Sequence, residues 1–296
     1  MISRYGIFCQ VIETGNFTYA ARQLGYSESS VSQSVKALER ELGVTLINRK
    51  RGGLELTADG RQFYPYILSI FNAEKALDQK NREVQGLEGS TISLATFTGI
   101  SRTILPPLMS SFQKKYPSVS FDLWQGEYNS IENAVREGSA DLGFVIEGSC
   151  QSLKTRVLYS EPMMAVVPLG HPLSRQPFVR LDQLAGQPFI LLDEGGYSVP
   201  LRAFEKEGLK PKVSYKVMDD YTILAMVRQG IGISMLYQNV LTGYSRDLAI
   251  LPIENGPGRT VLLAWNNSQT LPLAAKKFAR HILASMGNDQ AGENAQ

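Results

Sequence analysis

The chain of 296 residues contains little cysteine and no long apolar run. Its two cysteines, Cys9 and Cys150, are too few and too far apart for a disulfide scaffold, so we expect reduced thiols and a cytoplasmic protein. No stretch approaches the roughly 18 apolar residues that a membrane-spanning helix needs, and the first residues lack the apolar segment of a secretory signal. These absences argue against secreted disulfide folds and against a membrane partner.

An excess of charge of one sign is missing too. Thirty basic residues face 28 acidic ones, which leaves a net charge of +2. A strongly basic chain would indicate nucleic-acid binding by itself, and this chain does not. Any argument for DNA must therefore rest on where the charges lie, and three basic residues are adjacent, at Arg49, Lys50 and Arg51.

Histidine is scarce, which bears on the enzyme alternative. Only His171 and His281 occur, and His171 precedes Pro172 in a loop where we expect a structural role. The sequence has no Gly-x-Ser-x-Gly motif, no phosphate-binding loop and no metal-ligand cluster. We therefore predict no enzyme, no catalytic residue, no metal and no cofactor.

What the chain does contain is a set of short helices at its start. The first helix ends at Gly15, the second is expected at 18–24, and Gly25 then interrupts the chain. Ser27 is a suitable N-cap for a third helix, Glu28–Leu42, whose apolar residues fall on one face. Two short helices, a turn with glycine and a helix with a polar outer face predict a helix-turn-helix.

The outer face of the third helix has the chemistry of a recognition helix. It carries short hydroxyls, an amide and one cation, which can reach base edges and phosphates in the major groove. The predicted DNA contacts in the helix-turn-helix are Thr18, Ser27, Ser29, Ser30, Ser32, Gln33 and Lys36.

A hairpin follows the three helices. Residues 46–56 are typical of a strand, a Gly-Gly turn and a second strand, with the basic cluster near the tip. A run of three charges is often only a solvated loop. Its place directly after a helix-turn-helix favours a wing, so Arg49, Lys50 and Arg51 are also predicted to contact DNA.

The middle segment, from residue 58 to about 87, is predicted to be one long helix. Apolar residues recur along it at steps of four and three, as in a coiled-coil seam. The seam predicts dimerisation with a second copy, the alternative being packing on this chain's own domains; its members are Phe63, Ile67, Ile70, Leu77 and Val84. Pro65 is expected either to kink this helix or to mark a late start.

These segments carry a family resemblance. GNFTYAARQL at 15–24, VSQSVKALE at 31–39, LGVTLINR at 42–49 and LTADG at 56–60 resemble the N-terminal domain of LysR-type transcriptional regulators. The match is nearly continuous over about 60 residues, while the rest of the chain resembles the family in length and layout. Ser29 stands where the family usually has proline and Ile47 where it usually has Phe; the extra hydroxyl of Ser29 is expected to affect DNA preference.

The resemblance implies a fold class and a set of partners. The expected fold is an all-α winged helix-turn-helix with a long linker helix, followed by a two-lobed α/β domain like periplasmic binding proteins. The implied domains are 1–58 for DNA binding, 59–89 for the linker helix and hinge, and 90–296 for effector binding. The implied partners are promoter DNA, further copies in a dimer or tetramer, a small co-inducer and RNA polymerase.

From Thr91 onward the pattern indicates alternating strands and helices. The first lobe, about 90–162 and 266–290, is expected to contain strands Ile92–Phe97, Val119–Gln125 and Leu142–Ile146 with helices Ser101–Lys115 and Ser130–Glu137. The second, about 163–265, is expected to contain strands Phe189–Leu192, Val213–Val217 and Ile231–Met235 with helices Val199–Glu207 and Tyr221–Gln229. Strands Met163–Val167 and Val261–Trp265 are expected to cross between the lobes, and a helix Leu273–Ala284 to return to the first.

Ligands of open parallel sheets bind beyond the carboxyl ends of the strands. The loops at those ends are rich in hydroxyls, glycine and acids, although any single Ser or Thr there can be a simple helix cap. The predicted effector-binding residues are Thr96, Thr98, Gly99, Ile100, Ser101, Glu127, Ile146, Glu147, Asp193, Tyr197, Ser198, Asp219 and Ile233.

Acids dominate the charged residues of these loops. Glu127, Glu147, Asp193, Glu194 and Asp219 fall on the same predicted rim. We hypothesise a polar effector that carries an amine or several hydroxyls; the alternative is that most of these acids face solvent. Two other classes fit less well: an exported solute-binding protein lacks a DNA-binding domain, and a non-specific architectural DNA binder would be more basic.

Overall fold

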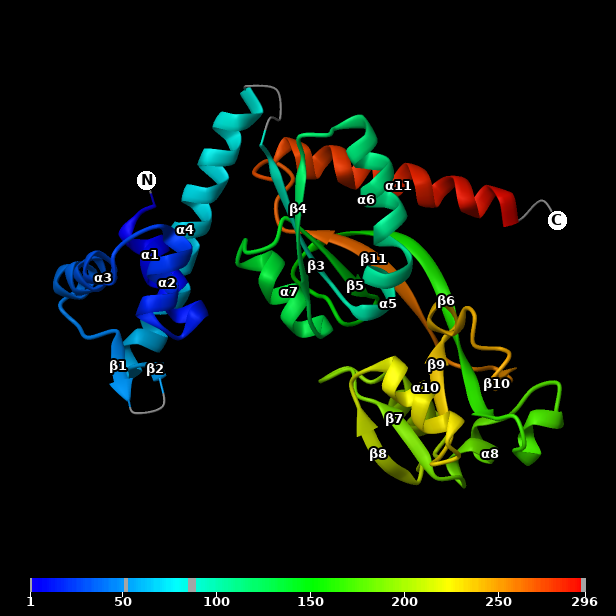
Figure 1. The fold of residues 1–296 in the computed structure, drawn as a ribbon. Helices are drawn as coiled ribbons and strands as arrows, with labels where there is room; N and C mark the ends of the chain where they lie inside the picture. The colour runs from blue at the N-terminus through cyan, green and yellow to red at the C-terminus, as the bar shows by residue number, and fades with distance from the viewer. Residues whose placement is uncertain (1, 51–52, 85–88, 294–296) are drawn as a thin grey trace. The chain divides into compact units, whose positions relative to one another are not determined.

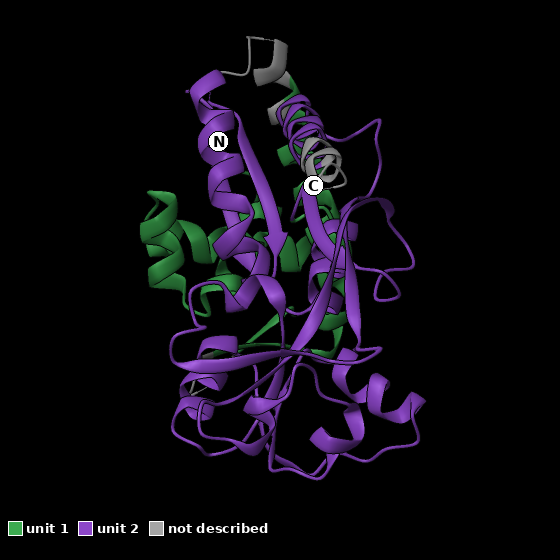
Figure 2. Ribbon diagram, turned by 90° about the vertical axis from the view of Figure 1, so that its right-hand side faces the viewer, with its two compact units in different colours: residues 1–84, 137–139 green, residues 85–136, 140–296 purple. Residues whose placement is uncertain are grey.

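The computed structural model describes residues 2–50, 53–84 and 89–293 (Figure 1). The chain forms two compact units, residues 1–84 with 137–139 and residues 85–136 with 140–296 (Figure 2). Each unit has its own hydrophobic core. No helix in the described ranges combines the length and the apolar character needed to cross a membrane.

Three helices open the first unit, and the predicted helix-turn-helix is confirmed. Their bounds are α1 (Arg4–Thr14), α2 (Phe17–Leu24) and α3 (Glu28–Leu42). The side chain of Asn16 accepts a hydrogen bond from the Tyr19 amide at 3.0 Å, and Ser27 accepts one from the Ser30 amide at 3.2 Å, so both helices have capped N-termini. Gly25, between the two, has a φ of 70°, which explains why glycine stands at the turn.

The core of this unit is formed by the inward faces of the helices. Phe8, Val31 and Leu38 have no exposed surface. Cys9 lies among them, and burial raises the pKa of its thiol to about 12, so it behaves as the small buried hydrophobe that its apolar neighbours predict.

The predicted wing is present as strands β1 (Ile47–Lys50) and β2 (Gly53–Leu56), which pair antiparallel. The carboxylate of Glu39 on α3 accepts hydrogen bonds from the backbone amides of Leu46 at 2.8 Å and Ile47 at 3.2 Å. One side chain therefore fixes the start of the wing against α3. The tip at 51–52 lies outside the described residues.

The long helix α4 (Ala58–Val84) begins at Ala58, so a late start at Pro65 is wrong. Its apolar stripe does not face one partner along its whole length. Ile67 is 2% exposed and packs in the core of its own unit, where Phe63 also packs, because α4 covers α1 with this part of its surface. Ile70 and Leu77 are 43% and 72% exposed and remain available to a second copy, while the Val84 side chain lies outside the described set.

The second unit is built on a seven-stranded sheet in the order β10-β6-β11-β5-β3-β4, with β9 also paired to β6. Strand β3 runs parallel to both β4 and β5, as βαβ units require. The strands are β3 (Thr91–Thr96), β4 (Ser120–Gln125), β5 (Leu142–Ile146), β6 (Lys154–Pro168), β9 (Ser234–Tyr237), β10 (Leu248–Pro252) and β11 (Gly258–Trp265).

Helices cover both faces of the first-lobe part of this sheet, formed by β3, β4, β5, β11 and the first half of β6. Figure 1 shows α7 (Tyr128–Arg136) on one side and α6 (Leu105–Lys115) with α11 (Leu273–Glu293) on the other. Phe278 of α11 packs against Phe112 of α6, with ring centres 5.0 Å apart, so the C-terminal helix returns to the first lobe as expected.

One predicted helix of this lobe is wrong. The expected helix Ser101–Lys115 consists of α5 (Thr98–Thr103) and α6, separated at Ile104. Pro106 and Pro107 stand at the start of α6. Proline suits the first turn of a helix but cannot continue one, because its ring clashes with the preceding turn and it has no N–H to donate.

The second lobe contains the parallel pair β7 (Phe189–Leu192) and β8 (Val213–Val217) beside β9, β10 and the second half of β6. Its helices are α8 (Leu181–Ala185), α9 (Val199–Lys206) and α10 (Asp220–Arg228), with 3₁₀ turns at Pro172–Arg175 and Gln238–Leu241. His171 caps the first of these turns by accepting a hydrogen bond from the Leu173 amide at 3.2 Å, which is a structural role.

Strand β6 connects the two lobes. Residues 154–162 pair with β11 in the first lobe, and residues 163–168 pair with β9 and β10 in the second, so the expected crossing at 163–167 is part of a longer strand. The expected crossing at 261–265 is different: β11 pairs with β5 and β6 along those residues and lies within the first lobe.

Candidate functional site

The outer face of α3 is one candidate site. Ser29, Ser30, Gln33 and Lys36 are exposed and Ser32 is partly exposed, as the predicted recognition face requires. Side chains at the N-terminus of α3 are linked to one another. The Ser27 hydroxyl lies 2.9 Å from that of Ser29 and 2.7 Å from that of Ser30.

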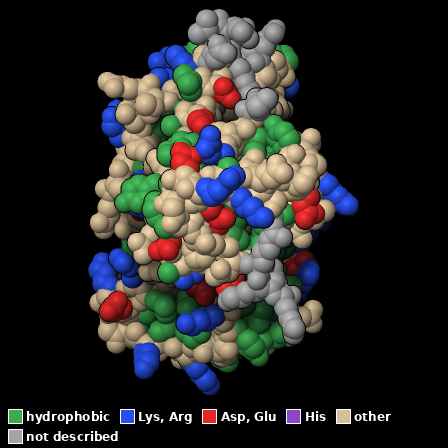
Figure 3. Space-filling view, turned by 90° about the vertical axis from the view of Figure 1, so that its left-hand side faces the viewer, with side chains coloured by type: hydrophobic (Ala, Val, Ile, Leu, Met, Phe, Trp, Pro, Cys, Tyr) green, Lys and Arg blue, Asp and Glu red, His purple; other side chains and the backbone are tan. Residues whose placement is uncertain are grey.

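The other predicted DNA contacts lie at the edges of this face. Thr18 on α2 is exposed and donates a hydrogen bond to Glu28 at 2.6 Å, which places an acid beside the N-terminus of α3. The backbones of Arg49 and Lys50 are in β1, whereas their side chains and the whole of Arg51 lie outside the described residues. On the face drawn in Figure 3, described Lys and Arg side chains are interspersed with Asp and Glu, in keeping with the low net charge.

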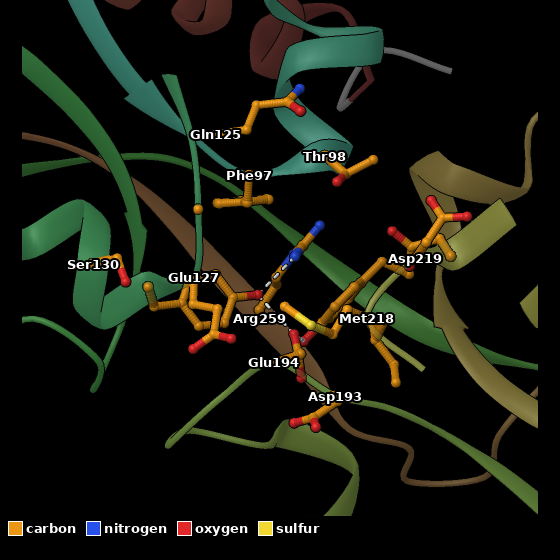
Figure 4. Close-up of a pocket in the computed structure, with 16 residues that line it drawn as sticks. Phe97, Thr98, Gln125, Glu127, Ser130, Asp193, Glu194, Met218, Asp219 and Arg259 are labelled. Carbon is orange, nitrogen blue, oxygen red and sulfur yellow. Dashed lines mark hydrogen bonds between the residues drawn. The ribbon is translucent and has the colours of Figure 1, made fainter. Parts of the chain in front are cut away.

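A second candidate site is a cavity of about 480 Å³ between the two lobes of the second unit. In Figure 4, Arg259 lies at its centre, with Phe97 and Thr98 on the first-lobe side and Asp193 and Glu194 on the second. The residues that line it are Phe97, Thr98, Gly99, Gln125, Gly126, Glu127, Tyr128, Ser130, Leu192, Asp193, Glu194, Met218, Asp219, Asp220, Tyr237 and Arg259.

Five of the predicted effector residues line this cavity: Thr98, Gly99, Glu127, Asp193 and Asp219. They follow the carboxyl ends of β3, β4, β7 and β8, where the sheet rule places them, with Thr98 and Gly99 in the first turn of α5. Their role in binding stays a prediction.

Four of the predicted effector residues lie in the hydrophobic core or fully buried beside it. Side chains alternate between the two faces of a strand, so Thr96 and Ile146, the last residues of β3 and β5, can turn inward although they stand at strand ends. Thr96, Ile100, Ile146 and Ile233 are at most 2% exposed and do not line the cavity.

The remaining four lie near the cavity but outside its lining. Ser101 accepts a hydrogen bond from Gln125, and Ser198 caps α9 by accepting one from the Leu201 amide at 3.4 Å. Glu147 and Tyr197 border a separate hollow, of about 520 Å³. Ser198 thus acts as a simple helix cap, which was the alternative to ligand binding considered from the sequence.

The principal residue that sequence reasoning missed is Arg259, on β11. Its side chain is 4% exposed, and its Nε and Nη2 donate to Glu161 Oε1 at 2.8 and 2.7 Å. Its guanidinium carbon lies 3.4 Å from the ring centre of Tyr237 and 4.5 Å from that of Phe97. No local sequence signal marked it, because its partner Glu161 is 98 positions away and meets Arg259 only where β11 pairs with β6.

Glu194 joins the lobes through the same network. Its Oε1 accepts hydrogen bonds from Tyr128 of the first lobe at 2.7 Å and from Tyr237 of the second at 2.8 Å. Tyr128 in turn accepts a hydrogen bond from Arg259 Nη1 at 2.9 Å. Burial raises the pKa of Glu194 above its usual value, although the two tyrosine hydroxyls and Arg259 oppose that rise.

Two adjacent acids at the start of α10 have opposite environments. Asp219 accepts hydrogen bonds from the hydroxyl and the amide of Thr222, at 2.7 and 2.8 Å, and the hydroxyl bond is the main reason that its pKa is lowered. Asp220 is 6% exposed, and burial raises its pKa to about 6 against the opposing charge of Arg259. Above the two acids, Arg102 of α5 stacks on Tyr221 of α10, with its guanidinium carbon 3.3 Å from the ring centre.

Within the described ranges, no three His, Cys, Asp or Glu residues are grouped so that they could hold a metal ion. The residues that line the cavity provide hydrogen-bond acceptors, charge and aromatic surface, which suit the binding of a small organic molecule.

A winged helix-turn-helix and a two-lobed α/β unit with an interlobe cavity define a DNA-binding regulator with a substrate-binding domain. Residues 2–61 match the family model "Bacterial regulatory helix-turn-helix protein, lysR family", and residues 85–287 match the "LysR substrate binding domain". The chain belongs to the LysR family of transcriptional regulators. The resemblance seen in the sequence and the predicted fold class are confirmed.

Relatives and solved structures agree with this assignment. The HTH-type transcriptional regulator YvbU of Bacillus subtilis (strain 168) is 30% identical over 281 residues, which cover 94% of this chain and 96% of that protein. CbnR in complex with its target DNA has a TM-score of 0.71 at 21% identity, covering 95% of this chain and 98% of that one. The Synechocystis PCC6803 CcmR regulatory domain in complex with 2-PG has a TM-score of 0.62 at 22% identity, covering 67% of this chain and 98% of that one.

The family assignment decides between the function classes considered from the sequence. The relatives are transcriptional regulators and not enzymes, so the enzyme alternative fails. The exported solute-binding protein and the non-specific architectural binder also fail, because the helix-turn-helix and the substrate-binding domain both belong to the LysR family.

Proposed function

We propose that this regulator binds promoter DNA through α3 and the wing, and that a small co-inducer in the interlobe cavity changes that binding. The observation that carries the proposal is the cavity itself: both lobes line it, and β6 and the Arg259–Glu194 network connect them. A ligand that contacts both lobes can favour one arrangement of the lobes over another. The solved complexes of CbnR with DNA and of CcmR with 2-PG support the two kinds of partner.

In this proposal the protein works in the cytoplasm as a dimer or tetramer and acts on RNA polymerase at the promoter. Exposed Ile70 and Leu77 on α4 support pairing through this helix, since an exposed apolar stripe is stabilised when a second helix covers it.

The experiment is a gel shift on the intergenic DNA beside the protein's own gene, run at several salt concentrations against random DNA. We expect a specific complex whose affinity falls with salt, because bound phosphates release counterions. Equal affinity for random DNA would contradict the proposal.

Two variants separate the roles of helix and wing. Arg49→Ala should weaken binding to all sequences and reduce the salt dependence, because it removes a phosphate contact. Gln33→Ala should change the preference among operator variants by about 1–3 kcal/mol, because an amide on a recognition helix reads base edges. The exchange of these two outcomes would show that the roles are wrongly assigned.

A further inference from the structure

Asp220 lines the interlobe cavity and has a buried carboxylate oxygen without a hydrogen-bond partner among the described residues. The residue is 6% exposed, and the unpaired atom is its Oδ1. Buried polar atoms in folded proteins are nearly always paired, so an unpaired carboxylate oxygen at a cavity wall indicates a donor that arrives with a ligand.

The two carboxylates nearest Asp220 in the chain or in the buried network, Asp219 and Glu194, already accept hydrogen bonds. Glu194 accepts hydrogen bonds from Tyr128, Tyr237 and the Val199 amide. Asp219 is occupied by Thr222. Asp220 is therefore the buried carboxylate at this wall that a ligand's N–H group would meet without breaking an existing bond.

The charge of the wall is strongly negative. The lining contains five acids and one arginine: Glu127, Asp193, Glu194, Asp219, Asp220 and Arg259. Arg259 does not offset these acids, because two of its nitrogens donate to Glu161, a further acid that is 4% exposed. The charged groups that act on Asp220 are Arg259, Glu194 and Asp219, and Arg102 acts on Asp219.

We propose that the cavity binds a small organic cation with N–H donors, an ammonium or guanidinium group that donates to Asp220. The inference rests on the proposed function, in which this cavity is the effector site. Its volume of about 480 Å³ lies within the ordinary range of small-molecule sites, roughly 300–1,000 Å³.

Other ligand classes fit this wall less well. An anion would meet five carboxylates and an arginine that Glu161 already neutralises. A metal ion lacks a grouped set of ligands within the described part of the chain. A quaternary ammonium brings no N–H for Asp220, and the rings of Phe97 and Tyr237 are already packed on Arg259.

The test uses the full chain and three probes that share a four-carbon skeleton: 1,4-diaminobutane, 1,4-butanediol and succinate, with methylguanidine as a second cation. Calorimetry and thermal shift at pH 7.5 should show saturable binding of a cation and none of the diol or the dicarboxylate. Asp220→Asn should lower the affinity for that cation by about 10- to 100-fold, because a charged hydrogen bond is lost. Glu205→Gln, the same change at an exposed acid of α9, should leave the affinity unchanged.

A pH series adds a second readout. Since burial raises the pKa of Asp220 to about 6, cation affinity in the wild-type protein should fall between pH 7.5 and 5. The residual affinity of Asp220→Asn should depend less on pH over this range.

Three results would overturn the inference: no binding of either cation, stronger binding of succinate than of the cations, or equal cation binding by wild type and Asp220→Asn. Binding of Mg²⁺ in place of the amines would also overturn it. A parallel gel shift of the wild-type protein separates failure of this inference from failure of the proposed function. If the protein binds its promoter specifically but responds to an anion, the proposed function stands and only the proposal of a cationic ligand is rejected.

Discussion

Asp220 and Asp219 are adjacent acids with opposite effects on stability. Burial raises the pKa of Asp220 from 3.8 to about 6, so the folded state holds this proton more tightly than the unfolded chain between those pH values. The free energy of unfolding therefore falls as pH rises through this window, by on the order of 3 kcal/mol for such a shift. Asp219 has a lowered pKa, so its contribution is present at neutral pH and is lost in acid.

Asp220→Asn should consequently stabilise the protein at pH 7.5, by about 1–3 kcal/mol, because it removes the charged form that burial disfavours. The gain should disappear at pH 4, where the aspartate is neutral. Asp219→Ala should instead cost about 1 kcal/mol at pH 7.5, because it removes the N-cap of α10. Urea unfolding at both pH values measures these differences, and a loss of stability in Asp220→Asn would contradict the assignment.

Arg259 is the residue on which the buried network depends most. Replacing Arg259 by Met leaves Glu161 buried without its cation, and breaking a buried ion pair in this way costs about 3–5 kcal/mol. The double variant Arg259→Met with Glu161→Gln should recover part of that loss, because no unpaired charge remains. Denaturant unfolding of Arg259→Met, Glu161→Gln and the double variant measures the coupling, and strictly additive losses would show that the pair is not coupled.

At the scale of elements, the helix-turn-helix was predictable because its signals are local. The caps at Asn16 and Ser27 and the glycine at Gly25 act within a few residues of where they stand. The helix 101–115 was predicted wrongly because apolar periodicity continues across Pro106 and Pro107, although the backbone cannot. The burial of Ile67 within its own unit could not be predicted from the sequence either. An apolar heptad pattern is the same whether the helix packs on its own unit or on a second copy.

The wing depends on one contact from the recognition helix. Glu39→Ala leaves the Leu46 and Ile47 amides without their acceptor, which should cost about 1–3 kcal/mol of stability. DNA affinity should fall further than stability does, because the wing loses its fixed position beside α3. Gel shifts and thermal melts measure the two effects. Glu41→Ala, at an exposed acid on the same helix, is the control and should lose at most a surface ion pair with Arg4.

At the scale of the whole molecule, the location of the cavity was predictable and its chemistry was not. The sheet rule placed Thr98, Glu127 and Asp219 at its rim from the predicted carboxyl ends of the strands. Arg259 joins residues that lie 98 and 131 positions away in the chain, Glu161 and Tyr128. No local pattern encodes such a contact, because it arises only when β11 pairs with β6.

The exposed apolar face of α4 allows a test of how copies of the chain associate. Leu77 is 72% exposed on α4, and Leu77→Lys would place a charge in the proposed seam between two copies. We expect the dimer to dissociate at concentrations at least about tenfold higher than for wild type, since burying an unpaired lysine costs more than 1.4 kcal/mol. Leu169→Lys, a matched change at a 57% exposed leucine in a loop, should leave association unchanged.

Sedimentation equilibrium measures the association of both variants. Because a paired helix-turn-helix contacts two half-sites, promoter affinity should fall together with dimerisation in Leu77→Lys and stay unchanged in Leu169→Lys. Unaltered association would mean that copies meet through another surface.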